Sequence, residues 1–140
     1  MKLRAFTVEK LANMVVGDNS LFLYKSSYWI TQFFTRCDMD YVHGGATRRI
    51  WAKDVLTELN DQPEDNADLP SSGILRVITE LFDEDDFDRG EKQRGPALEE
   101  LNKLLARDHL AAYFDDTGVA SCEIPGREMP QRGHLRQSVR

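Results

Sequence analysis

A glycine pair followed by a hydroxyl and two guanidiniums is the arrangement in this sequence best suited to binding chemistry. Gly44 and Gly45 precede Thr47, Arg48 and Arg49 where a helix should begin. Backbone N–H groups at a helix N-terminus point at an anion, and arginines bind phosphate oxygens in pairs of hydrogen bonds. We therefore interpret these five residues as a candidate phosphate or nucleic-acid site. They also fit a tight turn with positive φ, a threonine cap and two solvated arginines, because no Gly-Lys-Ser/Thr follows.

Arg36 and His43 form a second candidate pair, with six residues between them. Some helical RNA-cleaving domains carry an arginine and a histidine at about this spacing on one helix, where they transfer protons and bind phosphate. Asp38, Asp40 and the glycine pair instead indicate a loop in this interval. A loop argues against that arrangement on one helix, and a small ribonuclease that uses Arg36 and His43 is the third hypothesis.

No other residues are spaced like a metal or catalytic site. Cys37 and Cys122 lie far apart, and the three histidines are too scattered to complete the four close ligands of a zinc site. The acidic run from Asp83 fails as a calcium loop, because Phe87 and Asp88 stand where a carboxylate and a glycine are needed. We expect no catalytic residue, metal or cofactor, and two inert thiols.

Charge divides the 140-residue chain into three parts. Residues 1–60 carry eight Lys/Arg and six Asp/Glu, a net of +2, whereas residues 61–124 carry six and seventeen, a net of −11. Residues 125–140 carry four arginines and one glutamate, a net of +3. The acidic middle disfavours nucleic acid as a partner. No apolar run is long enough for a membrane helix or a signal peptide, so we expect a cytoplasmic protein without a membrane partner.

Apolar periodicity predicts a mainly α fold of about five helices. The expected helices cover residues 6–17, 20–36, 47–60, 71–82 and 96 to about 107, with Thr47 and Pro70-Ser71-Ser72 at two starts and Pro96 at another. An acidic loop is expected over 83–94. The second helix is rich in aromatic residues, which predicts a central place in the core or a partner surface. Tyr28, Trp29 and Trp51 are the candidate interface residues.

The end of the chain changes character after His109. Residues 110–114 and 119–124 read as strands around the turn 115–118, which predicts a C-terminal β-hairpin. Two helices followed by a hairpin have the order of a winged helix, but the would-be recognition helix carries Glu99 and Glu100, which disfavours DNA contact. We expect one domain over residues 1–124 and a basic, flexible tail over 125–140.

Two stretches together resemble accessory domains found at the N-termini of bacterial abortive-infection and related phage-defence proteins. They are Asp40-Tyr41, Gly45, Thr47-Arg48, Trp51 and Leu56-Thr57-Glu58-Leu59-Asn60, then Leu69-Pro70, Leu75-Arg76-Val77-Ile78, Phe87 and Ala97-Leu98-Glu99-Glu100-Leu101-Asn102 with the hairpin. The resemblance spans residues 28–124 and implies a domain that precedes a separate effector. It carries over no catalytic residues.

Three functional hypotheses follow. The first is a non-catalytic protein-interaction or regulatory module, whose partner is another protein or effector domain, with a homodimer as a further alternative. The second is nucleic-acid or nucleotide-phosphate binding through Gly44 to Arg49, helped by the basic tail. The third is the ribonuclease.

Overall fold

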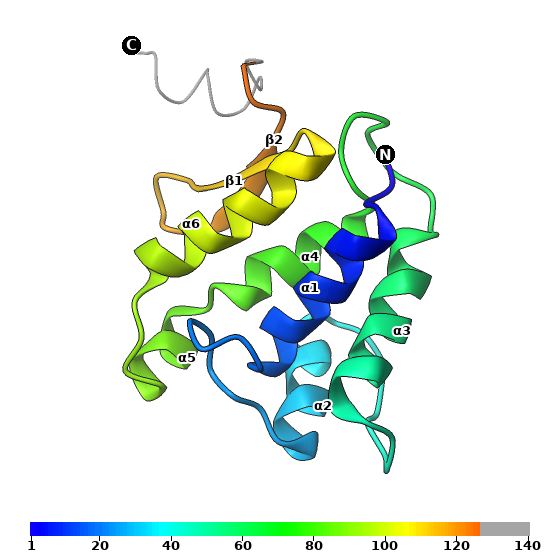
Figure 1. Ribbon diagram of the computed structural model, residues 1–140, viewed down its shortest axis with the longest axis vertical. Coiled ribbons are helices and arrows are strands. Elements are labelled where there is room, and N and C mark those ends of the chain that lie inside the picture. The colour runs from blue at the N-terminus through cyan, green and yellow to red at the C-terminus, as the bar shows by residue number, and fades with distance from the viewer. Residues whose placement is uncertain (127–140) are drawn as a thin grey trace.

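The computed structural model describes residues 1–126 and confirms a mainly helical fold with a C-terminal β-hairpin (Figure 1). The elements in chain order are α1 (Ala5–Val16), α2 (Ser27–Arg36), α3 (Arg48–Asn60), α4 (Ser72–Leu81), α5 (Glu84–Arg89), α6 (Arg94–Leu105), the 3₁₀ turn η1 (Ala106–Asp108), β1 (Ala111–Phe114) and β2 (Ala120–Glu123). All but two of residues 125–140, the expected flexible tail, lie outside the described residues.

One apolar cluster, from Leu3 near the start of the chain to Cys122 on the hairpin, joins the helices α1 to α6 and both strands. α1 and α4 run through the middle of the molecule, with α2 and α3 towards one end and α6 with the hairpin towards the other (Figure 1). Four rings close the core around α5: Phe82 stacks on Phe87 at 5.8 Å, Phe22 meets both edge-on, and Phe114 meets Phe82 edge-on. Among the described residues, no helix is long and apolar enough to span a bilayer.

The hairpin pairs Ala111 with Glu123 and Phe114 with Ala120 in antiparallel register. The Asp115 carboxylate accepts hydrogen bonds from the Thr117 and Val119 amides, which folds the predicted turn. The Asn102 side chain of α6 bonds to both backbone groups of Ala112, at 2.7 and 3.0 Å. Because Thr79 of α4 also donates to the Ala120 carbonyl, two helices hold the hairpin through its backbone. The predicted order of two helices followed by a hairpin is found in α4, α6 and the strands β1 and β2.

Two parts of the predicted helix pattern are corrected. The second helix begins at Ser27 rather than at residue 20, and the predicted acidic loop contains the short helix α5. The Asp83 side chain caps α5 by accepting from the Asp86 amide, and Phe87 anchors the helix in the core. Six residues with one apolar anchor give too little periodicity to detect in a sequence.

The segment between α1 and α2 is a tight loop instead of the first turns of a helix. Gly17 ends α1 with a φ of 80°, and a Cβ there would lie 2.1 Å from the Leu23 carbonyl oxygen. The chain then folds back, so that the Lys25 amide donates to the Val16 carbonyl. This fold-back brings Tyr24 and Lys25 against the end of α1.

Candidate functional site

Five large apolar side chains are exposed in the segments that lead into and begin α2 and α3, and both helices begin at the same end of the molecule (Figure 1, bottom). We call these residues the aromatic face; they are Tyr24 (60% exposed), Tyr28 (62%), Trp29 (43%), Val42 (71%) and Ile50 (51%). Isolated exposed apolar residues are ordinary, but several that gather on one face mark an interaction surface. The aromatic face is therefore the candidate functional site.

The aromatic second helix divides its rings between the core and this surface. Ile30, Phe33 and Phe34 point inward and are fully buried. Tyr28 and Trp29 remain outside and pack edge-to-face on each other at 5.1 Å. The structure thus exposes two of the three predicted interface residues.

Trp51, the third predicted interface residue, does not stand on the surface. It is only partly accessible and packs edge-on against Phe34 at 5.8 Å and His43 at 5.1 Å. Ile50, its neighbour, is the exposed member of the pair.

Arg48 is an internal clamp rather than a ligand for phosphate. Its guanidinium donates to the Lys25 carbonyl at 2.9 Å and the Val16 carbonyl at 2.7 Å, and it pairs with Asp18 at 3.2 Å. The same group lies over the Tyr24 ring, 4.3 Å from its centre. Arg48 therefore fastens α3 to the end of α1 and holds Tyr24 in place.

The other residues of the predicted phosphate turn are not arranged as an anion cradle. Gly44 and Gly45 do not have positive φ, and a Cβ on either would meet nothing within 4 Å, so the expected glycine turn is absent. Thr47 occupies the N-cap position of α3, but its side chain makes no capping hydrogen bond. Arg49 is exposed and makes no ion pair with a described residue. Of the two arginines, only Arg49 makes no ion pair within residues 1–126.

His43 holds the turn together. Its Nε2 lies 2.7 Å from the Ala46 carbonyl oxygen and must donate there, while Nδ1 lies 2.6 Å from the Ser27 hydroxyl. The His43 amide also donates to Thr31. Arg36 has different partners, on α4 and α5, so the structure does not combine Arg36 and His43 in one site.

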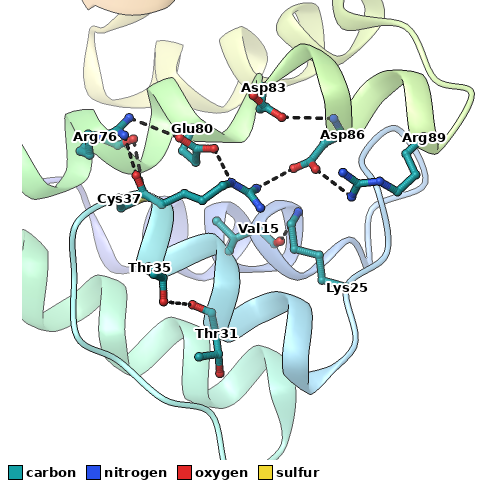
Figure 2. Close-up of polar contacts among 11 residues, drawn as sticks. Val15, Lys25, Thr31, Thr35, Cys37, Arg76, Glu80, Asp83, Asp86 and Arg89 are labelled. Carbon is teal, nitrogen blue, oxygen red and sulfur yellow. Dashed lines mark hydrogen bonds and ion pairs between the residues drawn. The ribbon is translucent and has the colours of Figure 1, made fainter.

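A charge network behind the aromatic face joins α2 to α4 and α5 (Figure 2). Arg36 pairs with Glu80 at 2.7 Å and with Asp86 at 3.0 Å. Asp86, 4% exposed, also pairs with Arg89, whose guanidinium lies 5.2 Å from the centre of the Trp29 indole ring. The network therefore supports Trp29 from behind, as Arg48 supports Tyr24.

Lys25 is the buried cation next to this network (Figure 2). Its ammonium donates to the Val15 carbonyl at 2.9 Å and lies over the Phe33 ring. Burial lowers the Lys25 pKa to about 8, and the nearby Asp86 carboxylate opposes that shift in part. The network is not predicted from the sequence. One signal for it is present there, because Lys25 is the only charged residue between Asp18 and Arg36.

The two cysteines, the remaining candidates for chemistry, lie in the interior of the protein. Cys37 and Cys122 are buried and unpaired, and burial raises the pKa of each thiol to about 12. Thiolate chemistry is thereby suppressed at neutral pH. Within residues 1–126, no group of three or more histidine, cysteine or acidic side chains is arranged to hold a metal ion.

The sequence around the aromatic face contains no carboxylates. There is no Asp or Glu between Asp18 and Asp38, or between Asp40 and Asp54. These two stretches contain all of α2 and the first turns of α3, whose N-termini add partial positive charge at the same end. The face is thus apolar, aromatic and mildly positive on a protein of net charge −6.

Comparison with known proteins adds no relative: no family model, no curated protein and no solved structure matches the chain.

Proposed function

We propose that this chain is a non-catalytic protein-interaction module that binds its partner through the aromatic face. The carrying observation is that Tyr24, Tyr28 and Trp29 are exposed together while paired arginines brace two of them from behind. Tyrosine, tryptophan and arginine are the residues that dominate binding energy in protein interfaces. Rings held by the fold also lose little conformational freedom on binding, which favours affinity.

The chemistry of the face favours a protein partner with apolar and acidic side chains. Its own segments, residues 19–37 and 41–53, contain no carboxylate, and both helix N-termini there favour negative charge. Nucleic acid is a weaker fit, because affinity for it depends on the number of phosphates that cations neutralise. Near this face only Arg49 and Lys53 are exposed without an ion pair in the described part of the chain. We further propose an effector of phage defence as this partner, on the strength of the sequence resemblance.

Affinity capture from host lysate tests this function with a matched pair of variants. The wild type, the double variant Tyr28→Ala/Trp29→Ala, and Val119→Ala, which changes a residue 45% exposed on the hairpin, are compared after nuclease treatment. We expect one protein partner to remain with the wild type and Val119→Ala and to fall at least about tenfold with the double variant. Equal recovery with all three proteins would exclude the aromatic face. Recovery of the chain itself, with dimers in solution, would identify the homodimer alternative.

Nucleic-acid binding stays as a second candidate because Arg49 and Lys53 stand free near exposed aromatic rings, a combination used to bind single strands. In that case the untreated lysate yields nucleic acid that is lost at physiological salt. Arg49→Ala/Lys53→Ala should abolish this recovery and leave the protein partner in place. Recovery unchanged by salt and by these substitutions would remove the candidate.

A further inference from the structure

A second surface combines an exposed aromatic ring with positive charge. α1 and α6 border a groove of about 440 Å³, in the usual size range of small-ligand sites. Phe6, 43% exposed, lies at one end of the groove. The Arg107 guanidinium is 4.5 Å and the Lys10 ammonium 5.4 Å from the centre of its ring. Lys103, one turn before Arg107, lines the same groove.

These three cations have no carboxylate partner in the part of the chain that the structure describes. Seven of the fourteen Lys and Arg residues in 1–126 make ion pairs, and Lys10, Lys103 and Arg107 are among the seven that do not. Like charges one helical turn apart repel each other. A cluster of cations left unneutralised on an acidic protein is a place where an anion gains binding energy.

The nearby acids do not fill this role. Asp108 follows Arg107 in sequence but pairs with Arg4 at 2.9 Å, and its side chain is only 4% exposed. Asp18 lines the groove but pairs with Arg48. Glu100 is the one lining carboxylate without an ion pair among the described residues.

The groove is polarised along its length. Phe6, near the start of α1, contacts Arg107, which follows the end of α6, so the two helices run antiparallel (Figure 1). Glu100, about two turns earlier on α6, therefore lies towards the other end of α1. The cations stand at one end, and a carboxylate that accepts hydrogen bonds stands towards the other.

We propose that this groove binds a small phosphate ester with hydroxyl or amino donors at its far end, such as a sugar phosphate or a nucleotide. The phosphate lies among Lys10, Lys103 and Arg107, where charge-assisted hydrogen bonds are strongest. The donors face Glu100, and the Phe6 ring forms an apolar wall. This site is separate from the aromatic face, and the proposal does not depend on the proposed function.

Titration of the ¹⁵N-labelled chain, followed by amide chemical shifts, tests the site. The probes are AMP, ribose 5-phosphate, inorganic phosphate and adenosine. We expect saturable shifts in residues 6–19 and 100–107 with both esters, at least about tenfold tighter binding of an ester than of inorganic phosphate, and no saturation with adenosine. The tighter of the two esters identifies the class of ligand.

Three glutamine variants provide the matched comparison. Lys103→Gln and Arg107→Gln keep most of the side chain, and each should weaken ester binding about tenfold with the amide spectrum otherwise retained. Lys92→Gln removes a lysine between α5 and α6 that makes no ion pair within residues 1–126 and does not line the groove, so it should change nothing. An equal loss with Lys92→Gln, or an ester that binds no tighter than inorganic phosphate, would mean an adventitious ion only. Absence of saturation at millimolar ester would also overturn the proposal.

Discussion

The aromatic face and the groove between α1 and α6 both set positive side chains against exposed rings, and they differ in how the charge is balanced. On the face, Arg48 and Arg89 each pair with an aspartate while they support a ring. In the groove, Lys10 and Arg107 lie on Phe6 and make no ion pair within residues 1–126. The proposed protein-binding face thus has paired arginines, whereas the proposed anion groove has cations without such partners. Removal of a paired charge should therefore cost stability, and removal of an unpaired one should not.

The largest effect is expected at Asp86, where two arginines depend on one buried carboxylate. Asp86→Ala leaves Arg36 and Arg89 without this partner, and breaking such a buried pair should lower the free energy of unfolding by about 3 kcal/mol. Urea denaturation measures the loss. Asp86→Asn keeps the shape and some hydrogen bonds, so it should lose less. A change below about 1 kcal/mol in Asp86→Ala would show that the network adds little.

Adjacent arginines provide the next test. Arg48→Ala leaves the Lys25 carbonyl without its donor, removes one of the two donors to the Val16 carbonyl and breaks the ion pair with Asp18, so it should cost about 2 kcal/mol. Arg49→Ala, one residue along, should stay within about 0.5 kcal/mol. Thermal unfolding of the two variants under the same conditions measures which of them loses more stability. Equal losses would contradict the assignment of Arg48 as a clamp.

Lys25 predicts a pH dependence of stability. Below pH 8 both folded and unfolded chains hold its proton, so the cost of the buried charge is fully present. Between about 8 and the ordinary 10.5 the unfolded chain keeps a proton that the folded chain has released, so the Lys25 contribution to stability rises with pH. Compared with Lys25→Met, the wild type should gain about 1–2 kcal/mol from pH 7.5 to 10.

The comparison with Lys25→Met is needed because the cysteines act in the opposite direction. Their pKa values rise from 9.0 to about 12, so above pH 9 the folded chain holds protons that the unfolded chain loses, and stability falls. Both proteins share this loss, and the difference between their urea midpoints isolates Lys25. Parallel curves from pH 7.5 to 10 would refute the lowered lysine pKa.

The smallest effect is expected in the groove. Lys103→Gln removes an unpaired cation and a like-charge contact with Arg107, so the free energy of unfolding should change by no more than about 0.5 kcal/mol. Differential scanning calorimetry at low salt measures it. A loss comparable to that of Arg48→Ala would mean that Lys103 has a structural partner, and the contrast between the two surfaces would fail.

Periodic elements could be predicted closely from the sequence, and irregular ones could not. The third helix and the hairpin lie within one or two residues of their expected bounds. The sequence predicts a second helix from residue 20, because Asn19 or Ser20 can cap it and Leu23 and Tyr24 fit its apolar face. The loop found there depends instead on Gly17 and on Arg48, 31 residues away. Such a contact leaves no local signal.

The candidate site shows the same limit. The sequence marks Tyr28, Trp29 and Trp51 as candidate interface residues but does not decide which of them are exposed, because the exposure of Trp29 and Ile50 and the partial burial of Trp51 depend on tertiary packing. Arg48 and Arg49 are indistinguishable as sequence, and only tertiary structure makes one a clamp and leaves the other free. The buried network was missed because its members are spread from Lys25 to Arg89.

Gly17 has a consequence for the evolution of this fold. The Leu23 carbonyl and the Tyr24 backbone occupy the space of any side chain at this position, and the φ of 80° is costly for other residues. Any homologue that keeps the fold-back should therefore retain glycine here, whereas Gly44 and Gly45 are free to drift. Divergent relatives would then share one glycine at the end of the first helix and one arginine at the start of the third, even where little else aligns.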